Sequence, residues 1–178
     1  MDLPGESNSI MHNAEDVGVV ELATISFGQS FQITPLQLLR AVSAVINGGT
    51  LVTPHFGVKT VSSDGKEVQV LSWETKDDAV TQEVSDTMKM MLEKVVSEGT
   101  GNKAYIEGFS IGGKTATSQK LPRGSGKYIA SFVGFAPADN PEIIGIVLID
   151  EPVGTYYGGT IAAPVMKEVF ENVLPYLQ

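Results

Sequence analysis

Hydrophobic positions follow two different periods along the chain, and their order predicts an α+β fold. Three segments carry apolar residues every three to four positions, which is typical of amphipathic helices. Four others alternate or are continuously apolar between Gly and Pro residues, which is typical of a hairpin and three strands. The expected helices cover 32–49, 81–101 and 163–177, the hairpin 51–74, and the strands 109–119, 128–138 and 142–152. Helix, hairpin, helix, three strands, helix is an α+β order.

Local signals mark the ends of these elements. Thr34 and Gln37 form a Thr-x-x-Gln capping box around Pro35, and Gly48 is placed to stop this first helix. Asp64-Gly65 predicts the hairpin turn. The breaks between the last three strands are too short for helical crossovers, so these strands are expected to be antiparallel. The core-facing stripes are predicted as Val84, Met88, Met91, Leu92 and Val95, then Val165, Met166, Val169, Phe170, Val173 and Leu174.

Composition narrows the function classes. The 178 residues carry a net charge of −9, which disfavours nucleic acid or an anionic membrane as a partner. No cysteine is present, and His12 and His55 lack ligand spacing, so we expect no disulfide, metal or cofactor. The longest apolar run, Ile143 to Ile149, is far too short to cross a bilayer. No signal peptide is recognised, and the first residues resemble the middle of a larger chain.

Lys114 lies in a stretch with two conflicting interpretations. Gly108 to Thr115 matches the Gly-x-x-x-x-Gly-Lys-Thr pattern of a phosphate-binding loop, and an apolar strand ends at Asp150-Glu151. Such a loop needs a helix starting at the Lys-Thr, because free N–H groups there hold the phosphates. Pro and Gly residues within 122–126 break any such helix, so the nucleotide interpretation is disfavoured.

The alternative is the edge of a strand that binds an extended anionic ligand. Gly112, Lys114 and Ala116 would then share one face, with Gly113, Thr115 and Thr117 on the other. Glycines in a strand suggest that something approaches the backbone closely, and Lys114 would supply a cation for a carboxylate. From this stretch alone, an ordinary surface lysine on a Gly-rich strand is the better explanation.

Four stretches taken together resemble one family. They are ELATISFGQSFQITPLQLLRAVSAVINGGTLVTPH, EGTGNKAYIEGFSIGGKTATSQK, YIASFVGFAPADNPEIIGIVLIDEP and YYGGTIAAPVMKEVF. In this order they look like the C-terminal half of the transpeptidase domain of class B penicillin-binding proteins, of the sporulation and division type. The resemblance covers nearly the whole chain. It implies part of the penicillin-binding protein/serine β-lactamase-like fold, with an antiparallel sheet packed between helices.

The resemblance also implies a chemistry, acyl transfer from a D-Ala-D-Ala stem peptide outside the bacterial cytoplasmic membrane, with β-lactams acylating the same serine. Lys114, Thr115, Ala116 and Thr117 fall on the family's Lys-Thr-Gly motif. The side chains of Lys114, Thr115 and Thr117 would face the carboxylate of the stem peptide or β-lactam, and the Thr117 N–H would donate to the oxyanion. Strict alternation puts Lys114 and Thr115 on opposite faces, and a bulge or twist near the glycines could reconcile the two.

Two departures from the family pattern bear on activity. Ala116 adds a methyl group where the family has glycine, which is expected to weaken ligand binding while leaving the fold intact. The nucleophile is missing, since no Ser-x-Asn occurs and the one Ser-x-x-Lys, Ser63 to Lys66, falls on the predicted hairpin turn.

We therefore interpret residues 1–178 as the C-terminal portion of one transpeptidase domain, inactive alone. An exposed apolar face is expected where the N-terminal half would pack. The chain would be a fragment, self-associate, or work beside a separate chain, with any membrane anchor on a segment not present here. A degenerate binding or scaffold module of the same fold is the alternative, and a nucleotide-binding protein is a remote one.

Overall fold

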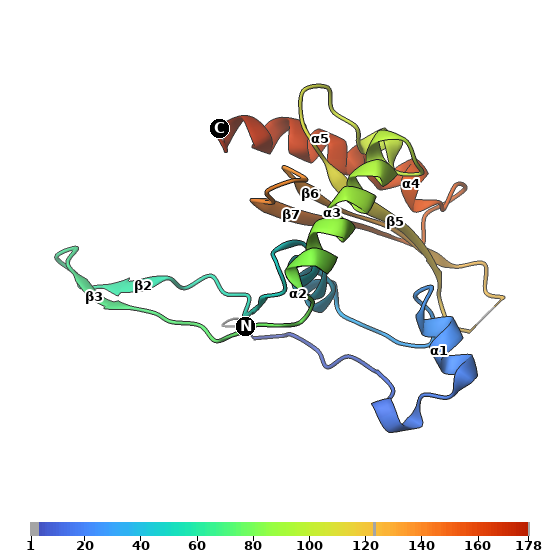
Figure 1. Ribbon diagram of the computed structural model, residues 1–178, viewed down its shortest axis with the longest axis horizontal. Helices are drawn as coiled ribbons and strands as arrows, with labels where there is room; N and C mark the ends of the chain where they lie inside the picture. Colours follow the sequence, from blue (N-terminus) through green and yellow to red (C-terminus); the bar gives the residue numbers. More distant parts are fainter. Residues whose placement is uncertain (1–3, 123, 178) are drawn as a thin grey trace. The chain divides into compact units, whose positions relative to one another are not determined.

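The computed structural model describes residues 4–122 and 124–177 (Figure 1). The chain divides into two compact units. The first comprises Met1–Ala44 and Thr50–Ala79, and the second comprises Val45–Gly49 and Val80–Gln178. The main elements follow the order expected for an α+β fold.

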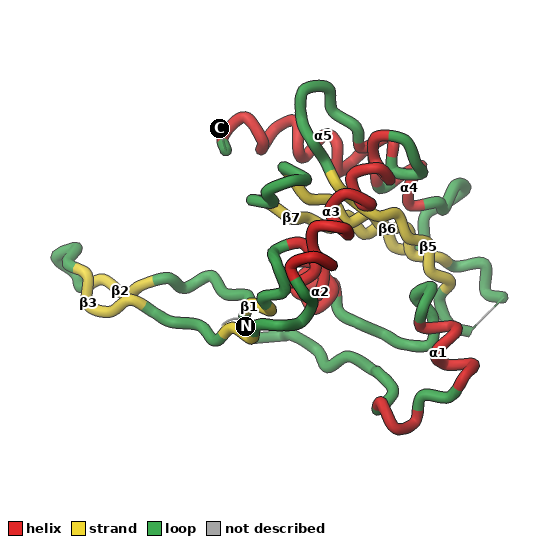
Figure 2. Tube along the Cα trace, in the orientation of Figure 1, coloured by secondary structure: helices red, strands yellow, loops and turns green. Residues whose placement is uncertain are grey.

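The second unit is built on a three-stranded antiparallel sheet in the order β5-β6-β7 (Figure 2). This confirms the three C-terminal strands and their antiparallel pairing. Short turns connect them, as the Pro and Gly breaks predicted. The strands are β5 (Gly112–Gln119), β6 (Tyr128–Ala136) and β7 (Ile143–Asp150), and the helical segments are α3 (Gln82–Ser97), η2 (Asn102–Ala104), α4 (Gly158–Ile161), α5 (Ala163–Val173) and η3 (Leu174–Tyr176).

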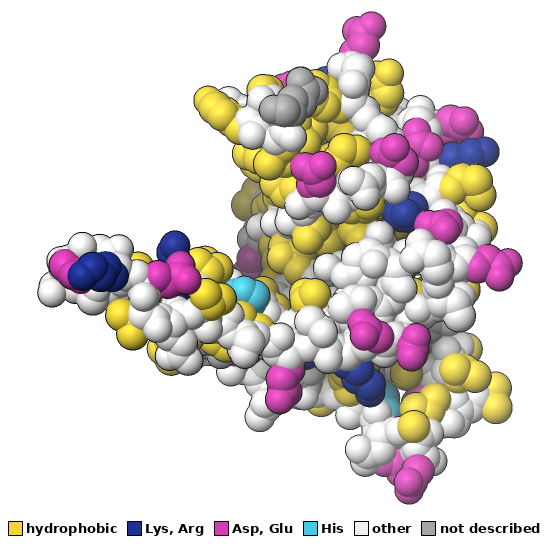
Figure 3. All heavy atoms as spheres, turned by 60° about the vertical axis from the view of Figure 1, so that its left-hand side comes forward, with side chains coloured by type: hydrophobic (Ala, Val, Ile, Leu, Met, Phe, Trp, Pro, Cys, Tyr) yellow, Lys and Arg dark blue, Asp and Glu magenta, His cyan; other side chains and the backbone are white. Residues whose placement is uncertain are grey.

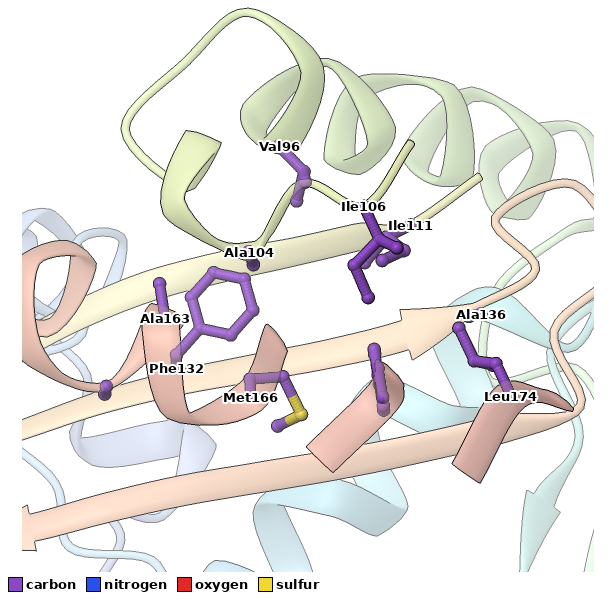
Figure 4. Packing of buried hydrophobic residues seen from close by; sticks show 11 residues of the cluster. Val96, Ala104, Ile106, Ile111, Phe132, Ala136, Ala163, Met166 and Leu174 are labelled. Carbon is purple, nitrogen blue, oxygen red and sulfur yellow. The ribbon is translucent and has the colours of Figure 1, made fainter. Parts of the chain in front are cut away.

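Phe132 of β6 is at the centre of the main hydrophobic core. Its side chain is fully buried and points towards Ala104 and Ala163 (Figure 4). Met166 and Phe170 of α5 cover the same face of the sheet. Burying a side chain of this size contributes about 1.5–3 kcal/mol. A smaller cluster packs on Phe135, whose neighbours on the β6 strand point to the opposite face, and it includes Ile46, Ala138, Leu92 and Ile144.

The two glycines at the start of β5 make room for these phenylalanines. A Cβ on Gly112 would lie 2.2 Å from the Phe135 ring, and one on Gly113 would lie 2.5 Å from the Phe132 ring. The glycines indicated that something comes close to the backbone here. In the structure two core side chains do so, and packing is therefore the reason for glycine at both positions.

The core-facing stripes of the two helices differ in part from the prediction. Val84 and Met91 of α3 are 45% and 55% exposed, while Ser85 and Val96 are buried. The buried face is centred one residue further along: Val96 packs in the main core, and the buried Ser85 hydroxyl accepts a hydrogen bond from the Gly48 N–H at 3.0 Å. On α5 the predicted Met166 and Phe170 are buried, as is Leu174 of η3, whereas Val165 and Val169 are 41% and 45% exposed.

The first unit contains short helices and two small strand pairs. Gln37 N donates to Thr34 Oγ1 at 3.2 Å, which confirms Thr34 as the N-cap of α2. The Gln37 side chain instead contacts Ser7 and Ser9, so it does not complete the capping box. The elements are η1 (Ala14–Asp16), α1 (Val19–Ile25), α2 (Pro35–Ile46, whose end belongs to the second unit), β1 (Leu51–Val52), β2 (Lys59–Val61), β3 (Glu67–Val70) and β4 (Thr75–Lys76).

The predicted hairpin is present as β2 and β3, with Asp64-Gly65 in the turn. Gly65 has φ +82°, a conformation that glycine adopts without strain. Every residue of both strands is exposed, including Val61, Val68 and Val70. At the base of the hairpin the Trp73 indole donates to the Gly57 carbonyl and stacks on His55. A two-stranded hairpin with this little burial contributes little to stability.

Hydrophobic side chains also gather on the surface of the second unit (Figure 3). Leu148 of β7 is 43% exposed, and Val165 and Val169 of α5 are exposed to a similar extent. In the part of the chain that is described, β7 is an edge strand. The exposed apolar side chains that we expected are present on this strand and this helix, and others lie on α3 and in the first unit.

Replacing Gly113 with alanine is predicted to destabilise the second unit by about 1–3 kcal/mol, because the added methyl overlaps the Phe132 ring and the Val133 carbonyl oxygen. Urea unfolding of the 178-residue chain measures the change. Ser118→Ala, an exposed position on the same strand, serves as the control and should change stability by less than about 0.5 kcal/mol. Equal stability of Gly113→Ala and the native chain would contradict the packing explanation.

Candidate functional site at the β5 edge

The candidate residues lie on one uninterrupted strand. β5 pairs with β6 from Gly112↔Phe135 to Gln119↔Tyr128 without a register shift. Paired residues share a face, so Lys114 and Ala116 lie on one side of the sheet and Thr115 and Thr117 on the other. A bulge near the glycines, one of the two ways considered to bring these side chains together, is absent from this register. A ligand can therefore contact residues from both faces only along the edge of the strand.

The backbone N–H and C=O groups of Thr115 and Thr117 do not bond to β6. Lys120 N donates to Lys127 O at 2.9 Å, and this pair continues the β5–β6 register. Hydrogen-bonded pairs alternate in an antiparallel ladder, so residues 114, 116 and 118 bond to β6. The N–H and C=O groups of Thr115 and Thr117 consequently point outward along the edge. An extended ligand can pair with this edge by adding a strand.

Lys114 brings a positive charge to this edge. Its side chain is exposed, and Nζ donates to the Thr115 carbonyl at 2.9 Å. Ala116 is exposed on the same face and pairs with Ser131. An ammonium group beside outward N–H groups is suited to an anionic ligand such as a carboxylate.

The two threonine hydroxyls have partners on the opposite face. Thr117 Oγ1 accepts a hydrogen bond from Gly158 N at 3.2 Å, and Thr115 Oγ1 lies 3.3 Å from Thr100 Oγ1. We did not single out Gly158 or Thr100 from the sequence. The adjacent glycines in YYGGT were the available signal, because a residue without a Cβ lets the backbone approach its neighbours closely.

An ion cluster joins the far ends of the three strands. Lys120 Nζ lies 2.9 Å from Asp150 Oδ1 and 2.8 Å from Glu151 Oε1, and Lys127 Nζ lies 2.9 Å from Glu151 Oε2. The hydrogen bond from Lys120, reinforced by Lys127, lowers the pKa of Glu151 below its ordinary 4.5. Glu151 and then Asp150 raise the pKa of Lys120 above 10.5.

This geometry excludes the phosphate-loop interpretation. Thr115 is followed by strand to Gln119 and not by a helix, so no helix N-terminus faces Lys114. Asp150 and Glu151 pair with lysines. Ser63 to Lys66 lies on the hairpin turn, where Lys66 pairs with Asp64, so this Ser-x-x-Lys is not at the buried start of a helix. Among residues 4–122 and 124–177, no group of His, Asp and Glu is placed to bind a metal.

Residues 1–171 match the family model described as the penicillin binding protein transpeptidase domain. The chain belongs to this family. The expected resemblance to class B penicillin-binding proteins is confirmed by the relatives. Stage V sporulation protein D of Bacillus subtilis is 43% identical over 182 residues. This alignment covers 99% of this chain and 28% of the length of the Bacillus protein. A probable peptidoglycan D,D-transpeptidase, PenA of Neisseria meningitidis, is 36% identical over 178 residues. This alignment covers 98% of this chain and 29% of the length of PenA.

Solved structures agree with this membership. Penicillin-binding protein 3 of Mycobacterium tuberculosis, crystallised with aztreonam, superposes with a TM-score of 0.85 at 28% identity. The match covers 98% of this chain and 42% of that one. The chain spans under a third of the length of stage V sporulation protein D and of PenA. No helix within the described residues is long and apolar enough to cross a bilayer.

Lys120→Met is predicted to lower stability most at about pH 7 and least at about pH 3. The pKa of Glu151 is depressed by folding, so its stabilising contribution is present above 4.5 and lost as the pH falls through the folded value. The change is small, because the pairs are solvent-exposed. Thermal unfolding at both pH values measures it, with Lys103→Met, an exposed lysine of η2, as the control. An equal loss at both pH values would contradict this account.

Proposed function

We propose that this chain is the C-terminal part of a peptidoglycan D,D-transpeptidase and forms one wall of its acyl-transfer site. The observation that carries the proposal is the outward edge of β5. There the Thr117 N–H and the Lys114 ammonium lie along one exposed strand. Family membership supports the reaction class. The site of action is the extracytoplasmic face of the bacterial cell membrane, where the peptidoglycan is.

Each group at the edge has a role that follows from its chemistry. Lys114 and the hydroxyls of Thr115 and Thr117 hold the terminal carboxylate of the stem peptide or a β-lactam. The stem peptide lies extended along β5 and pairs with the outward groups of Thr115. The Thr117 N–H donates to the oxygen that becomes negative in the tetrahedral intermediate, where a preorganised donor is most effective. No cofactor takes part.

The nucleophile and its base come from residues outside this segment. A covalent mechanism without its nucleophile retains only binding and oxyanion effects, so we propose that the 178 residues alone are inactive. The N-terminal portion of the domain, or a second copy of the chain, would cover the exposed apolar residues of β7 and α5. Those exposed residues support the need for such a partner.

A second candidate function is a non-catalytic binding or scaffold module of the same fold. Ala116 is the observation that favours it, because its methyl group is exposed on the same face as Lys114. A methyl there narrows the space beside the ammonium group. The module would keep the fold for contacts with other proteins and would not be acylated.

A chimera in which this chain replaces the matching segment of Neisseria meningitidis PenA tests the first proposal. A fluorescent penicillin should label the chimera covalently and leave the 178-residue chain unlabelled. Lys114→Ala in the chimera should lower the second-order acylation rate about 100-fold, because a charged donor to the carboxylate is lost. The thermal midpoint should change by less than about 2 °C.

Lys167→Ala is the charge-matched control, since Lys167 is a partly exposed lysine of α5 that pairs with Glu171. Its acylation rate should equal that of the unmodified chimera. A properly folded chimera that takes up no label would favour the scaffold function. Normal labelling of Lys114→Ala would remove Lys114 from the site.

Ala116→Gly in the same chimera should raise the rate of β-lactam acylation by about three- to tenfold, equivalent to about 0.7–1.4 kcal/mol. The methyl group that narrows the Lys114 face is removed, and the strand keeps its pairing with Ser131. Stopped-flow acylation measures the rate, and Ser118→Gly on the same face controls for added backbone freedom. An unchanged or lower rate would show that the methyl group is harmless.

A further inference from the structure

The backbone at Gly158 lies directly against the strand that carries the candidate site. Gly158 is buried, and a Cβ there would lie 2.3 Å from the Ala116 carbonyl oxygen and 2.2 Å from that of Ser131. Atoms cannot approach this closely, so only glycine fits at this point without moving the sheet. Ala116 and Ser131 are partners in the β5–β6 ladder. Gly158 therefore covers the peptide next to the Thr117 N–H, on the face opposite Lys114.

The same residue holds the Thr117 side chain. Gly158 N donates to Thr117 Oγ1 at 3.2 Å. A hydroxyl group has one proton to donate and two lone pairs to accept with. Because Thr117 Oγ1 is an acceptor in this bond, its own proton remains for another partner. Thr117 is exposed, so that partner can be a ligand at the β5 edge.

The contact continues through the next residue. A Cβ on Gly159 would lie 2.5 Å from the Thr100 carbonyl oxygen and 3.1 Å from Thr115 Cγ2. The Thr100 and Thr115 hydroxyls are 3.3 Å apart. The two glycines thus lie against both threonines of the strand. A rigid backing of this kind fixes side-chain positions more exactly than a mobile loop does.

We infer that Gly158 is a positioning residue for the proposed acyl transfer and acts through Thr117. The Gly158 N–H donates to the Thr117 hydroxyl oxygen and so holds that oxygen as a hydrogen-bond acceptor. The hydroxyl proton is then directed towards the carboxylate of the stem peptide or β-lactam. Because Gly158 has no side chain, its backbone can lie close enough to β5 to make this hydrogen bond. The inference rests on the proposed function, and it assigns to a residue off the strand a part in recognising the anionic end of the substrate.

The test removes the N–H without adding an atom. In the PenA chimera, Gly158 is replaced with glycolic acid by nonsense suppression, which changes the amide to an ester. Acylation by benzylpenicillin should fall about tenfold, because a hydrogen bond that orients a donor to a charged group is lost. Thr117→Val should cause a similar or larger fall. In the Thr117→Val background the ester should change the rate less than about twofold, because both changes remove one interaction.

Two controls separate this role from a merely structural one. The methyl ester of benzylpenicillin has no carboxylate, so its acylation rate should be the same with and without the ester at Gly158. The same backbone ester at Gly154, an exposed glycine of the preceding loop, should leave both rates unchanged. Thr117→Ser keeps the hydroxyl and should keep the sensitivity of the rate to the Gly158 ester.

Three other results of these rate measurements would show that the inference about Gly158 is wrong. If the ester and Thr117→Val lower the rate by independent, multiplying factors, Gly158 does not act through Thr117 and the inference is wrong. It is equally wrong if the ester slows both penicillins alike, or neither. In these cases the unmodified chimera is still acylated and the proposed function stands. If the unmodified chimera is not acylated, the proposed function and this inference fail together.

Discussion

The antiparallel pairing of β5 with β6 is the constraint on which the candidate site depends. The register fixes which residues of β5 bond inward to the sheet and which present their backbone at the edge. It is held in place by Phe132, whose ring fills the space left by Gly113. A slip by one residue would exchange the faces and turn the Thr117 N–H towards β6. Core packing and site geometry are thus two results of one register.

Thr115 and Thr117 connect the site to the rest of the fold. Each hydroxyl has a partner on the face opposite Lys114, and each backbone amide points out along the edge. In our proposal the same residues bind the substrate, so structural support and chemistry share a side chain. Such sharing explains how a strand at the edge of a sheet can hold donors in fixed positions, which electrostatic stabilisation of a transition state requires.

Buried contacts that hold the backbone in place are distributed unevenly along the chain. The second unit has a continuous core that joins α3, the sheet and α5, and an ion cluster at the far ends of its strands. The hairpin β2–β3 of the first unit has only exposed residues. Local opening is expected to be easiest where few apolar contacts are made, which places the rigid part of the molecule behind the β5 edge.

Much of this was predictable from residue patterns alone. Turn and cap signals at Asp64-Gly65 and Thr34 act within a few residues of themselves, so they indicated the hairpin and α2 correctly. The short breaks between strands indicated antiparallel pairing, and the Pro and Gly residues after Thr115 disfavoured a phosphate loop. The resemblance to the penicillin-binding proteins pointed to Lys114, Thr115, Ala116 and Thr117 before any geometry was known.

Other features depend on contacts between residues far apart in the sequence, and only the tertiary structure decided them. The helix faces were misplaced at Val84 and Val165, because a periodic pattern cannot show which side of a broad apolar stripe finds a partner. The role of Gly112 and Gly113 depends on phenylalanines of another strand, and that of Gly158 on a threonine 41 residues away. Local sequence determines local backbone shape; long-range packing determines which backbones meet.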